Sequence, residues 1–218
     1  AGDICEVVAG CDVNQGNLDN FCDKYEVPLR FTDPKELIDS GEVDVIALLT
    51  PPAARAEIIF PAFQRGIHML VEKPFAENLP DAVSFVAAAQ EAGVKLAINQ
   101  ELRFVPNVLR AKEIIDSGEL GEIRFISHDH FQNRTRTGGW RKDEERLEIS
   151  IFSIHILDRI RWLMGRAPEA VSAVTRYWDP KVRGESFTSL TVQFEGGAMG
   201  TMVSNWHSPT MPESRLRV

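Results

Sequence analysis

Cysteine and long apolar segments are both scarce in this 218-residue sequence. Its three cysteines, Cys5, Cys11 and Cys22, are an odd number, and two of them lie in or beside an apolar segment. That pattern predicts buried, reduced thiols and a reducing compartment rather than a disulfide framework. No apolar run approaches a membrane span, and residues 1–11 contain no signal sequence, so we expect a cytoplasmic protein.

The 32 acidic residues outnumber the 24 basic ones, which gives a formal net charge of −8. Such a charge argues against nucleic acid or an anionic membrane surface as the main partner. The sequence also lacks internal repeats and the cysteine–histidine clusters of zinc sites, so no metal is expected. An apolar content of 44% supports a sizeable core, and the length favours two domains.

Short apolar strands alternate with helices over residues 1–99. The expected strands are residues 6–12, 43–49, 68–71 and 95–99. Helices are expected after the capping residues Asn14, Asp33 and Asn78, and over residues 55–65. Because the strands are apolar almost throughout, they predict an α/β domain whose parallel sheet is covered by helices on both faces.

Polar residues follow three of these strands. Asp12 ends the first, Thr50-Pro51-Pro52 follows the second, and Glu72-Lys73-Pro74 closes the third. Pro74 has no N–H and cannot continue a central strand, so Lys73 is expected at the rim where ligands bind in such sheets. A surface charge pair would be the plainer interpretation of Glu72 and Lys73 taken alone.

The pattern changes near Gln100, which predicts a second, α+β domain over residues 100–218. A helix is expected over residues 107–117, and strands over 122–131, 170–178, 187–194 and 199–206. The last two strands join across Glu195-Gly196-Gly197, a hairpin signal, so the sheet should be mostly antiparallel.

A predicted buried helix over residues 150–164 lies between these strands. Helical spacing would align Ile151, His155, Asp158 and Trp162 on one face, with Glu148 one turn earlier. A buried histidine is often no more than a hydrogen-bonded core residue. It is also the side chain that titrates near neutrality, so His155 is a candidate for acid–base chemistry.

Seven motifs occur in a familiar order along the chain. They are Asp12 at a strand end, Thr50-Pro51-Pro52, Val71-Glu72-Lys73-Pro74, Arg103-Phe104 with Pro106, Gly118–Ile123, Gly139-Trp140-Arg141, and His155 with Asp158 and Arg161-Trp162-Leu163. In this combination the chain resembles the Gfo/Idh/MocA family of NAD(P)-dependent sugar and polyol oxidoreductases over essentially its whole length. The resemblance implies a Rossmann-like domain, then a large open sheet that commonly forms the interface of a homo-oligomer.

The resemblance also implies which residues bind and react. Cofactor contacts are expected from Asp12, Thr50, Pro51, Pro52, Glu72, Lys73, Gln100, Trp140 and Arg141. Substrate contacts are expected from Arg103, Trp140, Glu148, His155 and Asp158. Lys73 would polarise the oxygen of a sugar, polyol or related carbinol, and His155 would exchange its proton. Asp12 has no basic residue beside it, which favours NAD over NADP.

The sequence departs from the family pattern at three places. The usual aspartate one turn before the histidine is Ile151, the usual glycine two before it is Ser153, and the usual histidine after the two prolines is Arg55. Glu148 is a possible substitute acid, although a glutamate at a helix start can simply favour the helix dipole. A non-catalytic, dinucleotide-binding sensor and a structural subunit are the alternatives, but retention of both Lys73 and His155 favours an enzyme.

No G-x-G-x-x-G turn is present, although such a turn brings the backbone of a dinucleotide fold to the pyrophosphate. Asp12 should lie about 20 residues beyond it, and only eleven residues precede Asp12. We therefore expect the sequence to begin inside the fold and to stop within a strand at Arg215–Val218. Two central strands should then each have an unpaired edge, and these 218 residues alone should bind NAD poorly.

Overall fold

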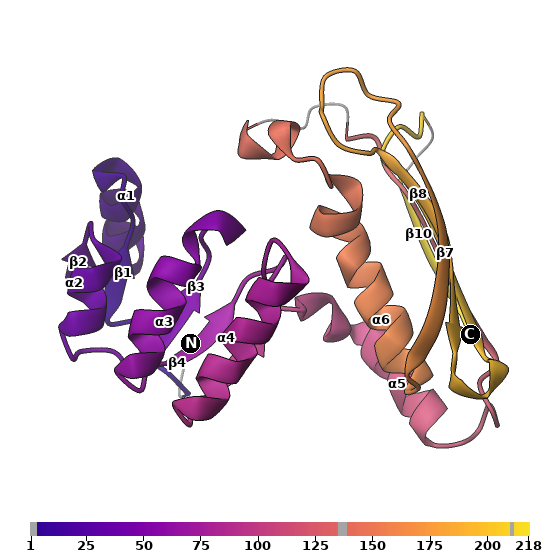
Figure 1. The fold of residues 1–218 in the computed structure, drawn as a ribbon, viewed down its shortest axis with the longest axis horizontal. Helices are drawn as coiled ribbons and strands as arrows, with labels where there is room; N and C mark the ends of the chain where they lie inside the picture. Colours follow the sequence, from indigo (N-terminus) through magenta and orange to yellow (C-terminus); the bar gives the residue numbers. More distant parts are fainter. Residues whose placement is uncertain (1–3, 135–138, 210–211) are drawn as a thin grey trace. The chain divides into compact units, whose positions relative to one another are not determined.

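A computed structural model of the chain describes residues 4–134, 139–209 and 212–218, without the side chain of Trp140. The chain forms two compact units, Ala1–Asn99 and Gln100–Val218 (Figure 1). Each unit has its own sheet and helices, and each is described by itself.

The first unit contains five parallel strands in two ladders. In one, β1 (Ala9–Cys11) pairs with β2 (Leu29–Phe31). In the other, β4 (His68–Val71) lies between β3 (Val45–Leu48) and β5 (Leu96–Ile98). No pairing joins β1 to β3 in the described residues, so each of these strands has one unpaired edge, as the sequence led us to expect. The three residues of β2 are too few for a recognisable sequence pattern.

Four α-helices belong to the first unit. They are α1 (Gln15–Tyr25), α2 (Pro34–Asp39), α3 (Ala56–Gln64) and α4 (Leu79–Glu91). The expected caps are confirmed: Asn14, Asp33 and Asn78 each accept a hydrogen bond from a backbone N–H in the first turn. Local sequence thus decides where three of the four helices begin.

The expectation that helices cover both faces of the sheet fails at β3 among the described residues, whereas β1 has α1 on the face of Gly10 and the core that includes α2 on the face of Ala9. Ile46 and Leu48 of β3 are buried in a core with residues of α3 and α4, whereas Val45 and Leu49 are 56% and 71% exposed. Side chains alternate along a strand, so the face of β3 that carries Val45 and Leu49 is uncovered.

The cysteines also differ from the expectation. All three are free thiols, but the buried one is Cys22 on α1, while Cys5 and Cys11 are exposed. Cys22 packs with Leu18 and Val27, and its sulfur lies where a Cβ on Gly10 would come within 2.8 Å. A glycine in β1 therefore allows α1 to approach the strand closely.

The second unit is built on one five-stranded sheet in the order β10-β6-β9-β8-β7. The strands are β6 (Phe125–Phe131), β7 (Pro168–Arg176), β8 (Phe187–Phe194), β9 (Met199–Asn205) and β10 (Glu213–Arg217). Among the described residues, only the β6–β9 pair of this sheet is parallel, which confirms a mostly antiparallel sheet. The short helical turn η5 (Glu195–Gly197) joins β8 to β9 as the hairpin signal predicted.

Two α-helices accompany this sheet, α5 (Pro106–Asp116) and α6 (Ile154–Met164). Ile156, Ile160 and Leu163 of α6 pack with Ile126 of β6 and Met202 of β9. The predicted helix over 150–164 is only partly α-helical, because residues Ile149–Ser153 form a π-helical turn, η4. A π turn has a different number of residues from an α turn, so spacing rules for an α-helix fail across it.

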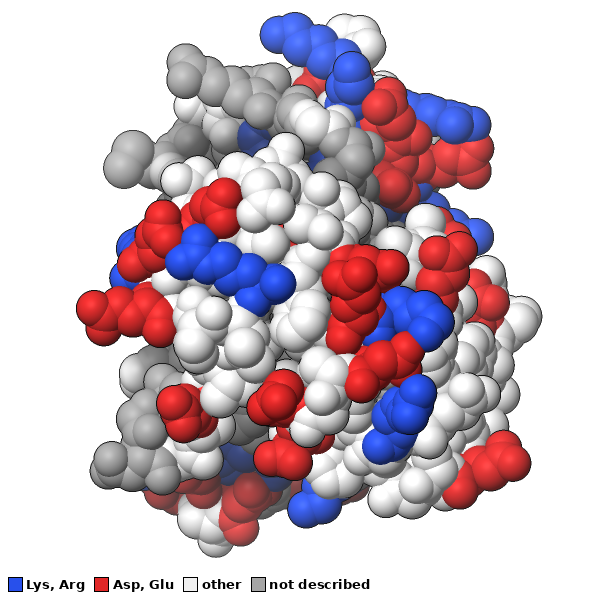
Figure 2. Space-filling model, turned by 90° about the vertical axis from the view of Figure 1, so that its left-hand side faces the viewer, with Lys and Arg blue, Asp and Glu red and all other residues white. Residues whose placement is uncertain are grey.

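The face drawn in Figure 2 has no continuous basic area, and the described residues include no membrane-spanning helix. On the face shown in Figure 2, acidic and basic side chains are interspersed among uncharged ones, without a continuous basic area. No helix among the described residues is long and apolar enough to cross a membrane.

Candidate active site

The rim of the first unit is formed where β3, β4 and β5 end. After β3 the chain turns at Thr50 into the short helix η1 (Pro52–Ala54), and Pro51 is exposed before it. After β4 it leaves the sheet at Glu72-Lys73, and the Lys73–Pro74 peptide bond is cis. The sheet thus places the predicted cofactor residues Thr50, Pro51, Glu72 and Lys73 after two neighbouring parallel strands.

Arg55, at the start of α3, connects these two turns from below the surface. Its side chain is 1% exposed. Nε and Nη2 both donate to the carbonyl oxygen of Thr50, at 3.1 and 2.8 Å. Nη1 donates to the carbonyl oxygens of Pro74 and Phe75, the latter at 3.1 Å. Burial lowers the pKa of this guanidinium, and the charge of Glu72 partly offsets that effect.

Glu72 extends the same connection to β5. One carboxylate oxygen accepts a hydrogen bond from Asn99 Nδ2 at 2.6 Å, and the other accepts one from the backbone N–H of Lys73 at 2.9 Å. Asn99 follows β5 directly. The ends of three adjacent parallel strands are therefore joined by side-chain hydrogen bonds around Lys73.

Two features of the first unit fit a bound dinucleotide. Thr50 Oγ1 is buried and makes no hydrogen bond among the described residues, so a hydroxyl at the rim has bonding capacity left for a ligand. Asp12 directly follows β1 and is half-buried. Its carboxylate accepts hydrogen bonds from the backbone N–H of Asn14 at 2.8 Å and from Asn17 Nδ2 at 3.5 Å. A carboxylate has room for further donors, such as ribose hydroxyls.

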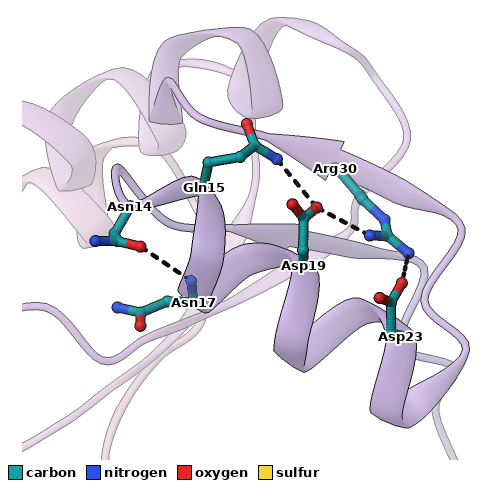
Figure 3. A network of polar contacts seen from close by, with 6 residues as sticks. All are labelled: Asn14, Gln15, Asn17, Asp19, Asp23 and Arg30. Carbon is teal, nitrogen blue, oxygen red and sulfur yellow. Dashed lines mark hydrogen bonds and ion pairs between the residues drawn. The ribbon is translucent and has the colours of Figure 1, made fainter.

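A basic residue on the strand beside β1 is already paired. Arg30 on β2 donates to Asp19 at 3.0 Å and to Asp23 at 2.5 Å, both on α1 (Figure 3). Its positive charge is thus balanced by two carboxylates. This arrangement agrees with the expectation of NAD rather than NADP, because a 2′-phosphate needs a cation that is available to it.

In the second unit, η2 (Glu101–Arg103) and α6 are joined by two side-chain contacts. His155, 4% exposed, places Nδ1 2.8 Å from Gln100 Oε1. Three residues along, Asp158 accepts a two-pronged hydrogen bond from Arg103, with Nε at 2.6 Å. The pair raises the pKa of Arg103. Four predicted site residues therefore come together in two pairs, His155 with Gln100 and Asp158 with Arg103, although the members of each pair are 55 residues apart in the sequence.

A carboxylate not anticipated from the sequence lies beside the histidine. Glu101 Oε1 is 3.8 Å from His155 Nε2, and the glutamate side chain is half exposed. Because Gln100 Oε1 is an acceptor, the neutral ring carries its proton on Nδ1 and its lone pair on Nε2. A protonated ring would then gain an ion pair with Glu101.

Glu148 directly precedes the π turn η4. Its side chain is fully buried, and Oε1 accepts a hydrogen bond from Ser153 Oγ at 2.5 Å. Burial raises the pKa of Glu148, while nearby hydroxyls of Ser153, Ser204 and Thr188 oppose that shift. Because η4 lies between Glu148 and His155, α-helical spacing does not predict whether the two side chains share a face. The role of Glu148 in substrate binding stays a prediction without geometric support.

Two buried histidines of β6 face the same interior. His128 lies 2.9 Å from Ser214 Oγ and 3.3 Å from Arg159 Nη1, and burial lowers its pKa to about 3. His130 stacks on Phe152 with ring centroids 3.9 Å apart. Its pKa falls to about 4, again chiefly through burial. Gln132 opposes that shift, although no hydrogen bond of normal geometry reaches either ring nitrogen among the described residues.

The glycine-rich loop is described only in part. Trp140 and Arg141 belong to the short helix η3 (Gly139–Asp143), Arg141 is exposed, and the side chain of Trp140 lies outside the described residues. Arg134, upstream, lies over the rings of Phe152 and Trp206 at 5.2 and 5.0 Å. Burial lowers the pKa of Arg134, and the nearby charge of Arg141 adds to this.

Sequence reasoning missed three residues at these rims: Arg55, Asn99 and Glu101. Arg55 was visible only as a departure from the family pattern, and Asn99 and Glu101 carry no motif. Lys73 belongs to the first unit and His155 to the second. Their roles in chemistry stay predictions.

Comparisons with known proteins place the chain in a family. Residues 2–100 match the model of an oxidoreductase family with an NAD-binding Rossmann fold, and residues 108–218 match the GFO/IDH/MocA C-terminal domain. The chain therefore belongs to the GFO/IDH/MocA family of oxidoreductases, as its motifs indicated. Its first domain is the NAD-binding domain of that family.

Curated relatives of this chain include dehydrogenases. A 1-carboxy-3-chloro-3,4-dihydroxycyclohexa-1,5-diene dehydrogenase of Comamonas testosteroni is 33% identical over 88% of this chain and 49% of its own length. A D-apiose dehydrogenase of Paraburkholderia graminis is 24% identical over 94% of this chain and 55% of its own. The chain thus spans about half the length of these relatives.

Solved structures share the fold. An oxidoreductase of Agrobacterium radiobacter, crystallised with NAD+, L-tartaric acid and magnesium, has a TM-score of 0.91 at 22% identity over 96% of this chain and 63% of that one. The WlbA dehydrogenase of Bordetella pertussis, crystallised with NADH and UDP-GlcNAcA, has a TM-score of 0.89 at 25% identity. The match covers 99% of this chain and 68% of that one.

Proposed function

We propose that the protein is an NAD-dependent dehydrogenase that oxidises a secondary alcohol of a sugar, polyol or related carbinol, or reduces the matching carbonyl. One observation carries the proposal. A chain with the family's NAD-binding domain keeps Lys73 at the end of β4 and an oriented, buried histidine, His155, on α6. A purely structural subunit would need neither.

When bound, NAD supplies the hydride acceptor. Asp12 would bind the ribose hydroxyls, and Thr50 and Pro51 would line the rim beside the nicotinamide end. Glu72, held by hydrogen bonds from Asn99 and from the backbone N–H of Lys73, would use its remaining acceptor capacity for the cofactor.

Lys73 would place an ammonium on the substrate oxygen and stabilise negative charge that develops there. His155 would take the hydroxyl proton on Nε2, because its hydrogen bond to Gln100 leaves the lone pair on that nitrogen. Glu101, 3.8 Å from Nε2, would stabilise the protonated ring and pass the proton to solvent from its half-exposed position. It would thus supply the negative charge that the family aspartate, here Ile151, does not.

The substrate class rests on relatives. Their names specify a carboxylated dihydroxycyclohexadiene, D-apiose and inositol, all with adjacent hydroxyl groups. The two curated relatives reported above and the WlbA structure all carry the names of dehydrogenases. They therefore support a dehydrogenase function for this chain over that of a non-catalytic sensor.

The test is NADH formation at 340 nm by the full-length protein across a panel of sugars, inositols and sugar acids. We expect turnover with at least one polyhydroxylated substrate and preference for NAD over NADP. Binding of NADH without turnover on any member, in either direction, would favour the sensor.

We also propose that the protein is a cytoplasmic homo-oligomer assembled through the second-domain sheet. The support is the sheet face opposite α6, which carries Phe125, Val174 and Met199 at 49%, 47% and 39% exposure. Exposed apolar side chains on a broad sheet favour a covering partner. Light scattering on the full-length protein tests this, and a monomer at micromolar concentration would contradict it.

A further inference from the structure

We propose that Arg55 is a positioning residue for Lys73: its buried guanidinium holds the turn after β3 and the turn after β4 in one arrangement. This inference rests on the proposed function, in which Lys73 acts on the substrate oxygen. Arg55 itself is buried and has no route to the substrate, so any effect must pass through the backbone that it binds.

The contacts show which parts of the chain Arg55 holds. Two of its nitrogens donate to the carbonyl of Thr50, the residue before Pro51. The third donates to the carbonyls of Pro74 and Phe75, directly after Lys73. Nineteen and twenty residues separate Arg55 from Pro74 and Phe75, so nothing in the local chain enforces this contact.

An arginine suits this position because three carbonyl oxygens must be satisfied at once. A guanidinium has five N–H donors in a planar fork, whereas an imidazole has at most two donors and a lysine ammonium is a compact point charge. The family's usual histidine could donate to the carbonyl oxygens of one turn, or to one oxygen in each turn, but not to all three oxygens. Replacement by arginine therefore strengthens the connection between the two turns rather than merely conserving a basic residue.

The position of Lys73 is further set on its other side. Its backbone N–H donates to Glu72, which also binds Asn99 after β5. Arg55 therefore completes a set of hydrogen bonds that joins β3, β4 and β5 around one lysine. Removing Arg55 leaves the Glu72 side intact but releases Pro74 and Phe75, so Lys73 should shift or become mobile without loss of the fold.

The experiment compares Arg55→Met and Arg55→Lys with the wild type in the full-length protein. Arg65→Met serves as the matched control, since Arg65 caps the other end of α3 and bonds Asp39 away from the rim. Three quantities are measured on each: kcat and KM at saturating NAD, the dissociation constant for NADH by fluorescence, and the rate at which an amine-acylating reagent labels Lys73, quantified by peptide mass spectrometry. Circular dichroism verifies folding.

In Arg55→Met we expect kcat to fall at least about tenfold, because small displacements of a reacting group have effects of this size or more. The KM and the NADH dissociation constant should change less than about threefold, since neither the substrate nor the cofactor touches Arg55. The labelling rate of Lys73 should change while that of other lysines does not. Arg55→Lys should be intermediate, and guanidinium added to Arg55→Ala, far below unfolding concentrations, should restore part of the lost kcat.

A folded Arg55→Met with wild-type kcat and wild-type labelling of Lys73 would overturn the proposal. If neither Arg55→Met nor Arg55→Lys folds, Arg55 serves folding rather than positioning, and the proposal is equally wrong. Absence of dehydrogenase activity in the wild type would instead contradict the proposed function. The labelling of Lys73 would still show whether Arg55 controls its position, so the two failures are distinguishable.

Discussion

Replacing His130 by phenylalanine should make the second unit less sensitive to acid. The imidazole is buried against Phe152, and its pKa is lowered to about 4 from an ordinary 6.5. A histidine with a lowered pKa stabilises the fold above pH 6.5, and this stability is lost as the pH falls toward 4, because only the unfolded chain takes up the proton. A phenylalanine keeps the ring stacking and cannot titrate.

The expected size follows from the two pKa values. Each pH unit between them changes stability by about 1.4 kcal/mol, so His130 should cost the wild type about 2 kcal/mol between pH 7 and pH 5. His128, with a pKa near 3, acts in the same direction and is retained in the variant. Glu148, whose pKa is raised, acts in the opposite direction in both proteins and cancels in the comparison.

Tryptophan fluorescence is suited to the measurement, because all four tryptophans, at positions 140, 162, 178 and 206, lie in the second unit. Urea unfolding would be followed for wild type and His130→Phe at several pH values from 5 to 8. Their difference in free energy of unfolding should grow by about 2 kcal/mol as the pH falls from 7 to 5. Any constant effect of the larger ring subtracts out.

Two parallel curves of stability against pH would refute the reasoning. They would mean that His130 takes up its proton in the folded protein as easily as in the unfolded one, and so that its burial is not what the structure indicates. A His68→Phe variant is a useful control, because His68 is only partly buried and lies in the first unit.

Three further predictions concern the site residues. Lys73→Ala in the full-length protein should abolish turnover and leave NADH binding within a few-fold, as kinetics and titration calorimetry would show; turnover retained within tenfold, about 1.4 kcal/mol of barrier, would remove Lys73 from the chemistry. Asp12→Ala should weaken NAD binding and relax discrimination against NADP, and because Asp12 also accepts a hydrogen bond from Asn14, it should lower stability by about 1 kcal/mol; unchanged coenzyme preference would place the ribose elsewhere. Glu148→Gln should stabilise the protein more at pH 8 than at pH 5, since a raised pKa means that the folded chain loses this proton at a higher pH than the unfolded chain does; a gain independent of pH in urea unfolding would contradict a raised pKa.

Much of the fold was predictable because its signals are local. A strand–helix alternation, a capping side chain or a proline acts within about four residues of itself, so α1, α2 and α4 begin after the caps that were expected. The ends of β1, β3 and β4, near Asp12, Thr50 and Lys73, were predictable from local sequence for the same reason. The burial of the β3 side chains could not be predicted in this way. Whether a second layer covers β3 depends on the rest of the fold and not on the residues of β3.

Two site features show where local reasoning fails. The spacing rule that put Glu148 on the face of His155 assumed an α-helix, but residues Ile149–Ser153 form a π turn, and Glu148 is hydrogen-bonded to Ser153. The contact of Gln100 with His155 spans 55 residues, and no periodicity in the sequence records it.

By itself, then, the sequence determined the class of fold, the family and the identity of the rim residues, since each of these depends on short motifs and their order. Only the tertiary structure decided which groups those residues meet. Arg55 is one departure from a family pattern in the sequence, but in the structure it becomes the link between Thr50 and the segment after Lys73. The reason is physical: hydrogen bonds of buried groups are chosen by proximity in space, which the chain acquires only when its strands have paired.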